Sequence, residues 1–176
     1  MKVLLIVAAA LALITMPQQA SAYQIKQVTL RLEGVHTDED GVAIMGALAQ
    51  VPNIKVATRP TAQNPTIILV ALEGAKYDLG DLARTVAGTK TPNRLQGAPS
   101  AVLLLTYKER DDEAAAARAR DLKTICAKLE GVDAKKCQLD TQKKEFQIKL
   151  DDKGGAKLAD IQKALPGLDT ENYPKR

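Results

Sequence analysis

The sequence is poor in aromatic residues. Only 3% of its 176 residues are aromatic, with no Trp and a single Phe, Phe146. Proteins that bind carbohydrates, or that stack on the bases of single-stranded nucleic acid, favour exposed aromatic faces, so neither ligand class is expected here. The hydrophobic core must therefore be built mainly from Val, Ile, Leu and Ala.

Side chains suited to catalysis are equally scarce. The chain has one His, His36, and beyond its first 22 residues one Ser, Ser100. Nucleophilic and general-base catalysis need a nucleophile with a base close to it, and no nucleophile motif surrounds Ser100. The Gly154-Gly155 pair lacks the pattern of a phosphate-binding loop. We therefore expect a protein that is not an enzyme.

The chain has no concentrated cluster of one charge. Its 25 Lys and Arg residues against 21 Asp and Glu give a net charge of +4, with an isoelectric point near 9.0. The basic residues are scattered, as in Lys135-Lys136 and Lys143-Lys144. Nucleic-acid-binding proteins usually gather such charges on one face, so a nucleic-acid partner is not expected.

The N-terminus has the three parts of a secretory signal peptide. Lys2 supplies a charge, Val3 to Met16 is apolar, and Ala20-Ser21-Ala22 is a small-x-small cleavage site. The apolar run is shorter than the roughly 20 residues of a membrane-spanning helix. We expect a signal peptide over 1–22, cleavage after Ala22, and a periplasmic or secreted protein with no stable membrane span. An uncleaved N-terminal anchor is the alternative.

Hydrophobic periodicity predicts the same order of elements twice, β-α-β-β-α. The first set comprises strands over 27–33, 54–58 and 66–72 and helices over 38–50 and 77–87. The second comprises strands over 101–107, 136–140 and 145–150 and helices over 111–129 and 156–165. The polar residues 169–176 form a tail.

This order predicts an α+β protein made of two tandem ferredoxin-like (βαββαβ) units, each with an antiparallel sheet and its helices on one face. The first unit, with a linker, covers 23–97, and the second covers 98–168. The alternative is one sheet shared by both halves, because the strand over 101–107 could equally close the first unit.

Core positions carry a family resemblance. A strand ends at Gly34, a helix supplies Ile44 and Ala47-Leu48, and a turn follows at Val51-Pro52-Asn53-Ile54. The second half repeats the later part with Leu129-Glu130-Gly131-Val132. This pattern resembles the heavy-metal-associated domain of copper chaperones and metal-transporting ATPases, in two degenerate copies.

The metal ligands of that family have no counterpart here. Its Gly-Met-x-Cys-x-x-Cys motif would place thiolates at Thr37 and Asp40 in the first copy, and near Ala115 and Arg118 in the second. Soft Cu(I) requires thiolate or thioether ligands. The resemblance therefore implies that both copies have lost the copper chemistry.

The loop from Gly34 to Asp40 is the candidate metal site. His36, Asp38 and Asp40 offer an imidazole and two carboxylates, which suit a borderline divalent ion such as zinc. The alternative is structural, because Thr37 and Asp38 can cap the following helix and acidic residues favour its first turn.

Cys126 and Cys137 are the other candidate pair. An even number of cysteines in an exported chain, on a helix and strand that can face each other, favours a disulfide. A buried inert pair and a thiol site for a soft metal are the alternatives.

Two functions follow from these patterns. The first is a binding module of the cell envelope, with weak divalent-metal binding or with metal binding lost. The second is a scaffold that binds an envelope protein partner through sheet edges or exposed helix faces.

Overall fold

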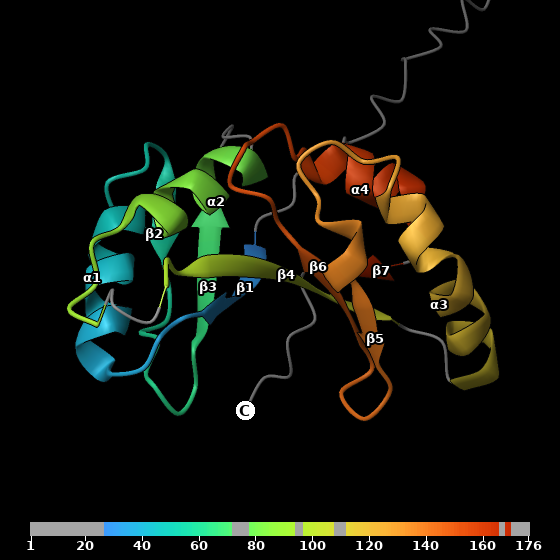
Figure 1. Ribbon diagram of the computed structural model, residues 1–176, viewed down its shortest axis with the longest axis horizontal. Helices are drawn as coiled ribbons and strands as arrows, with labels where there is room; N and C mark the ends of the chain where they lie inside the picture. Colours follow the sequence, from blue (N-terminus) through green and yellow to red (C-terminus); the bar gives the residue numbers. More distant parts are fainter. Residues whose placement is uncertain (1–26, 72–77, 94–96, 108–111, 166–167, 170–176) are drawn as a thin grey trace, which may run out of the picture.

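The computed structural model describes residues 27–71, 78–93, 97–107, 112–165 and 168–169 (Figure 1). Seven strands and four α-helices alternate in this part of the chain. They are β1 (Gln27–Glu33), α1 (Asp38–Leu48), β2 (Ile54–Val56), β3 (Thr66–Ala71), α2 (Leu79–Gly88), β4 (Ser100–Tyr107), α3 (Asp112–Cys126), β5 (Gln138–Asp140), β6 (Glu145–Lys149), α4 (Leu158–Ala164) and β7 (Leu168–Asp169). A 3-10 turn, η2 (Ala134–Lys136), precedes β5.

The strands form a single antiparallel sheet in the order β2-β3-β1-β4-β6-β5. Strand β4 is the link between the two halves, because it pairs with β1 over one edge and with β6 over the other. The short strand β7 pairs with the last two residues of β4, on the same edge as β1. The protein is therefore mixed α/β with one continuous sheet.

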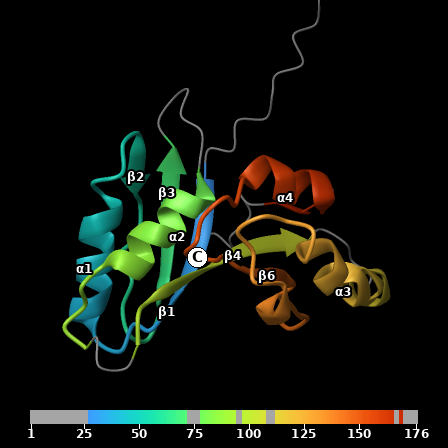
Figure 2. The same cartoon turned by 45° about the horizontal axis from the view of Figure 1, so that its top comes forward.

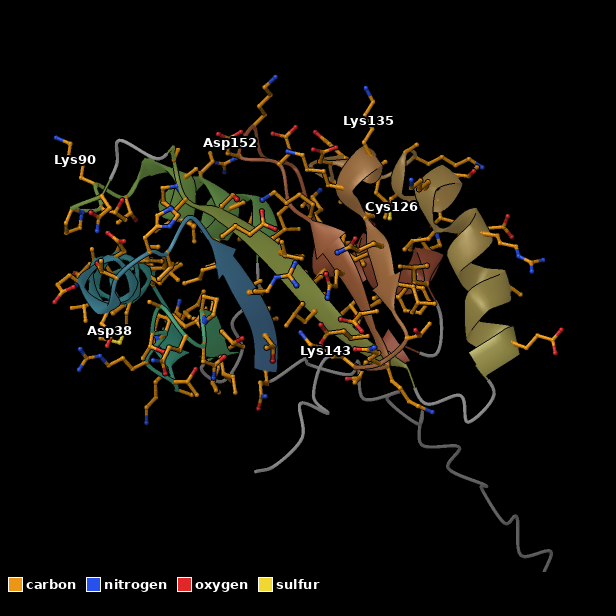
Figure 3. The ribbon with its side chains drawn as sticks, turned by 60° about the horizontal axis from the view of Figure 1, so that its bottom comes forward. Asp38, Lys90, Cys126, Lys135, Lys143 and Asp152 are labelled. Carbon is orange, nitrogen blue, oxygen red and sulfur yellow. The ribbon has the colours of Figure 1, made fainter. Side chains whose placement is uncertain are left out.

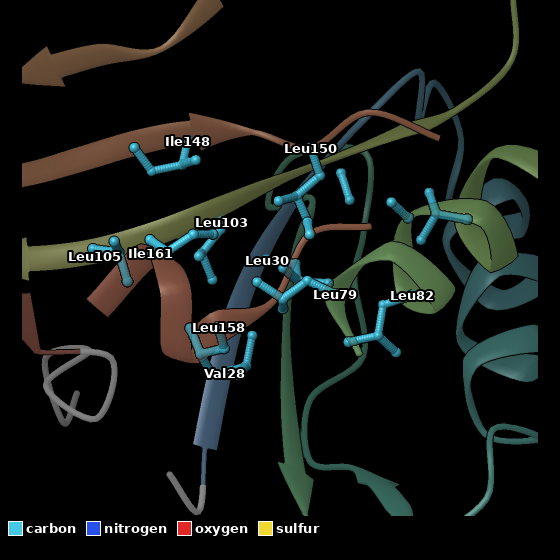
Figure 4. Close-up of a cluster of buried hydrophobic side chains, with 14 of the residues drawn as sticks. Val28, Leu30, Leu79, Leu82, Leu103, Leu105, Ile148, Leu150, Leu158 and Ile161 are labelled. Carbon is cyan, nitrogen blue, oxygen red and sulfur yellow. The ribbon is translucent and has the colours of Figure 1, made fainter. Parts of the chain in front are cut away.

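All four helices contribute to one hydrophobic core on one face of the sheet. Helices α2 and α4 lie over the centre, while α1 and α3 lie at opposite ends (Figures 1 and 2). Alternate residues of the strands point into this core, as the period of two predicts. Figure 4 shows the central part, where Leu30, Leu103 and Ile148 from the sheet meet Leu79 of α2 and Leu158 of α4.

The two halves are related by an approximate two-fold arrangement. Reading the sheet outward from its centre gives β1-β3-β2 on one side and β4-β6-β5 on the other. Phe146 of β6 follows Ile67 of β3 by 79 positions, and Leu158 of α4 follows Leu79 of α2 by the same interval. Leu30 and Leu103 are paired directly across the centre.

Helices α2 and α4 meet at their N-termini. Their N-cap residues, Asp78 and Lys157, form an antiparallel bridge, and the backbone N–H of Gly80 donates to the carbonyl of Ala156 at 3.2 Å. A Cβ on Gly80 would lie 2.6 Å from the backbone nitrogen of Gly155, closer than atoms approach. Glycine at position 80 is therefore required for this contact between the halves.

The repeated β-α-β-β-α order predicted from the sequence is confirmed by the element order. The two halves nevertheless share one sheet, which was the alternative to two tandem units with separate sheets. A strand long enough to pair with β1, β6 and β7 makes this sharing possible, since β4 has eight residues. The predicted signal peptide over 1–22 and the tail beyond Asp169 lie outside the described residues.

Candidate functional site

The turn before α1 contains the predicted metal ligands. Thr37 is the N-cap, and its hydroxyl accepts the backbone N–H of Asp40 at 3.4 Å. In return, Oδ2 of Asp40 accepts the backbone N–H groups of His36 and Thr37, each at 3.0 Å. This reciprocal capping box satisfies donors that the first turn of a helix leaves without partners.

Asp40 also binds a distant segment. The backbone N–H of Asn93 donates to Oδ1 at 3.2 Å, and its side-chain amide donates to Oδ2 at 3.2 Å. Burial alone would raise the pKa of Asp40, but the donors from His36, Thr37 and Asn93 outweigh it and hold the pKa below its ordinary value. The buried carboxylate thus ties the start of α1 to the segment that follows α2.

The other two predicted ligands are arranged differently. Oδ1 of Asp38 accepts the backbone N–H of Ala62 at 2.9 Å, and His36 is exposed. Across the described ranges, no three His, Cys, Asp or Glu side chains come together in a way that could hold a metal ion. The zinc site at His36, Asp38 and Asp40 stays a prediction, while both carboxylates have structural partners.

The resemblance to heavy-metal-associated domains assigned thiolate positions to Thr37 and Asp40. In the structure Thr37 is the N-cap of α1 and Asp40 is its reciprocal partner in the capping box. Both residues therefore stabilise the start of the helix. Ala115 and Arg118 lie within α3, in a part where side chains are not described.

Both cysteines are buried, and both carry free thiols in this structure. Cys126, which is labelled in Figure 3, ends α3, and Cys137 follows η2 directly. The thiol of Cys137 donates to the carbonyl of Asp133 at 3.4 Å. A hydrogen bond between the two sulfurs, together with burial, raises the pKa of Cys126. The same bond lowers the pKa of Cys137 against the effect of burial.

The predicted Cys126–Cys137 disulfide is thus not formed in this structure. The prediction of facing elements is confirmed, because α3 packs against η2 and β5, but the two sulfurs are not at bonding distance. The disulfide stays a prediction for the oxidised protein.

The sheet face opposite the core carries no helix among the described elements, and we call it the open face. Figure 3 looks onto this side, where β1, β4 and β6 cross the view with no helix in front of them. Polar and charged side chains dominate it along β1 and β6, since these alternate with the core residues.

One end of the open face is organised by Lys149 of β6. Its ammonium group donates to the carboxylate of Glu33 and to the hydroxyl of Ser100, and Arg31 lies 3.6 Å from the same carboxylate. Partial burial raises the pKa of Glu33, but the hydrogen bond and charge of Lys149 outweigh this and lower it overall. These contacts join β1, β4 and β6.

A second set of contacts runs along β6 and β5. The side-chain amide of Gln147 donates to Glu145 at 2.9 Å and accepts from the amide of Gln138 at 2.8 Å. Glu145, Gln147 and Lys149 are all buried although they are polar. The alternation of core residues Phe146 and Ile148 predicts which face these side chains occupy, but it gives no sign that they are buried.

The open face has two unlike parts. Val102 and Leu104 of β4 and all three open-face residues of β6 are buried, whereas the residues of β3 that correspond to those of β6, which are Thr66, Ile68 and Val70, are half-buried. We call the region of Arg31, Glu33, Thr66, Ile68 and Val70 the uncovered half, and the region over β4 and β6 the covered half. The sequence pattern does not distinguish them.

No protein-family model, curated protein or solved structure matches this chain. None of the helices in the described part has the length and apolar character of a membrane span.

Proposed function

We propose that the protein is an exported, non-enzymatic binding module whose partner is a protein of the cell envelope. The observation that carries the proposal is the uncovered half of the open face. There, Ile68 and Val70 of β3 place half-buried apolar side chains opposite the polar residues Thr29 and Gln27 of β1. Apolar contacts with a polar surround are the usual composition of a protein–protein interface.

The adjacent edge of the sheet supports the same reading. Among the described strands, β2 pairs with β3 alone, so its outer backbone groups face away from the sheet. An extended segment of a partner can add to such an edge through main-chain hydrogen bonds, while its side chains reach the neighbouring face. The uncovered half and β2 together therefore suit an extended peptide segment.

The first function predicted from the sequence, a metal-binding module, receives less support from the geometry. Both carboxylate oxygens of Asp40 accept N–H groups, and Oδ1 of Asp38 accepts the backbone N–H of Ala62. A metal ion would have to replace these bonds, at the cost of leaving buried backbone donors without partners.

The finer fold assignment is part of the proposal. We infer that each half descends from a ferredoxin-like unit resembling the heavy-metal-associated domain. Strand β4 would then be the last strand of the first unit and the first strand of the second. The order β1-α1-β2-β3-α2-β4 supports this for the first unit, and β4-α3-β5-β6-α4-β7 supports it for the second.

Site-specific crosslinking in cells tests the function. A photoreactive amino acid replaces Ile68 in the uncovered half, and in the matched control it replaces Thr124, which is exposed on α3. We expect position 68 to capture one discrete envelope protein, with capture reduced when the unmodified protein is co-expressed. Equal capture from both positions, or none from position 68, would contradict the proposal.

A further inference from the structure

The edge strand β2 directs a defined set of backbone groups away from the sheet. The backbone N–H of Ala57, which follows β2 directly, donates to the carbonyl of Ile68 of β3 at 2.8 Å. In an antiparallel ladder, residues that bond to the neighbouring strand alternate with residues whose backbone groups point the other way. Lys55 therefore also bonds toward β3, whereas the N–H and C=O groups of Ile54 and Val56 point away from it.

The pairing of β3 with β1 agrees with this alternation. The backbone N–H of Leu32 donates to the carbonyl of Pro65 at 2.7 Å, so the odd-numbered residues of β3 bond toward β1. The even-numbered residues bond toward β2, and among them Val70 lies opposite Lys55. Both ladders thus place two donors and two acceptors on the outer side of β2.

The side chains of β2 are divided between the two faces of the sheet. Ile54 and Val56 are partly buried and pack against the core, while Lys55 between them is exposed. Alternation places Lys55 on the open face, beside Val70 of the uncovered half. The strand therefore offers an apolar side and a cationic side to a segment that adds to its edge.

The chain that leaves β2 is fixed by its neighbours. The hydroxyl of Thr58 accepts the backbone N–H of Ile68 at 2.8 Å. A Cβ on Gly41 of α1 would lie 2.4 Å from the carbonyl oxygen of Pro60, so this segment packs directly on the helix. An edge held in this way is preformed, which lowers the entropy that binding a partner would cost.

Lys55 restricts which partners can use this edge. Because Ile54 and Val56 carry the outward groups, a partner residue opposite Lys55 forms a non-hydrogen-bonded pair, with Cβ atoms about 4.5–5.5 Å apart. A second copy that pairs antiparallel through the same three residues would place Lys55 opposite Lys55. Like charges oppose pairing at this distance, whereas a carboxylate opposite Lys55 favours it.

We propose that β2 binds an extended segment of the partner protein with the pattern apolar–acidic–apolar, whose carboxylate lies opposite Lys55. This inference rests on the proposed function and specifies the chemistry of the partner. The two apolar residues exchange main-chain hydrogen bonds with Ile54 and Val56, and their side chains extend the apolar side of β2. The acidic residue lies on the open face, in line with Lys55 and Val70.

Peptide selection on the purified protein tests this pattern. A phage library of random peptides is selected on the wild type, and we expect the enriched peptides to share an Asp or Glu between apolar residues. By fluorescence anisotropy, an enriched peptide should bind Lys55→Glu about fivefold more weakly than the wild type. It should bind Lys123→Glu, the control at an exposed lysine of α3, unchanged. Enriched peptides without an acidic residue, or equal binding to all three proteins, would overturn the proposal.

A backbone variant separates strand pairing from charge attraction alone. Val56→Pro deletes an N–H group that points away from β3, and edge strands tolerate proline at such positions. The enriched peptide should bind this variant several-fold more weakly, with the melting temperature close to that of the wild type. Unchanged binding would overturn the proposal. Should Val56→Pro fail to fold, the comparison with Lys55→Glu still decides the question.

Photo-crosslinking at position 68 distinguishes failure of this segment from failure of the proposed function. Undiminished capture of an envelope protein at position 68 in Lys55→Glu would overturn the β2 segment and leave the proposed function standing. Peptides bound through Lys55 without any capture at position 68 would contradict the proposed function and support the chemistry of the edge. A wild-type dimer that Val56→Pro dissociates, seen by sedimentation, would show that a second copy occupies β2 and would overturn the inference.

Discussion

At the scale of single residues, Asp40 shows how a candidate ligand becomes a structural group. The sequence places it in a loop with His36 and Asp38, in a position that the family resemblance assigns to a metal thiolate. In the structure the two carboxylate oxygens of Asp40 accept N–H groups of His36, Thr37 and Asn93. The contacts with Asn93, which lies 53 residues further along the chain, could not be predicted from local sequence patterns.

Replacing this carboxylate should weaken the fold. Asp40→Asn keeps the size but removes the negative charge and one acceptor, so we expect the free energy of unfolding to fall by about 1–2 kcal/mol. Glu39→Gln is the matched control, because Glu39 is exposed in the same helical turn. Urea unfolding at neutral pH measures both. A loss for Asp40→Asn no larger than for the control would contradict the structural role.

The same carboxylate should make stability depend on acidity. Since folding lowers the pKa of Asp40 from an ordinary value of 3.8, its contribution is fully present above that value. This contribution to stability is lost as the pH falls below 3.8 and then through the lower pKa of the folded state. The gap between the wild type and Asp40→Asn should therefore shrink between pH 5 and pH 2, a comparison that urea unfolding across that range makes directly. A constant gap would show that the charge is not involved.

The cysteine pair makes a separate prediction. A small disulfide reagent should oxidise Cys126 and Cys137 to one intramolecular bond, with two thiols of the reagent released. Closing so short a loop adds about 2–3 kcal/mol, which raises the melting temperature by roughly 5–10 °C. Mass spectrometry and thermal melting with and without reductant measure this. Failure to oxidise while folded would identify the pair as an inert buried one.

At the scale of elements, the contact between α2 and α4 depends on the absence of a side chain. Gly80→Ala would place a Cβ 2.6 Å from the backbone nitrogen of Gly155, so we expect a loss of about 2 kcal/mol or more. Gly46 of α1 is the control, since a Cβ there meets nothing within 4 Å. Gly46→Ala should instead stabilise by about 0.5–1 kcal/mol. Thermal melting of both variants checks the opposite signs.

Elements of ordinary length were predictable from the sequence. The strand over 27–33 and the helix beginning at Asp38 appear where alternation and the cap predicted them. By contrast, β7 has two residues and η2 three, too few to show a period. Alternation in β6 also predicted which side of the sheet Gln147 faces. Whether Gln147 is buried depends on what packs on that side, and the sequence of one strand does not show this.

At the scale of the whole molecule, the sharing of β4 makes the halves interdependent. The boundary predicted between 97 and 98 would remove β4 from the first half and leave β1 without its partner from Thr29 to Glu33. We therefore expect the fragments 23–97 and 98–176 to be unfolded when separate, and the intact chain to unfold in one transition. Circular dichroism with urea titration measures both. A fragment that unfolds cooperatively by itself would restore the picture of two tandem domains.

We propose that the uncovered half binds an envelope protein. The most direct test is the affinity of the partner captured at position 68, measured by titration calorimetry for the wild type, Ile68→Glu and the control Thr124→Glu. A charge placed at the centre of an apolar contact should weaken binding at least tenfold, or about 1.4 kcal/mol, while the control leaves it unchanged. Equal affinities for all three proteins would show that the partner binds elsewhere and would contradict the account.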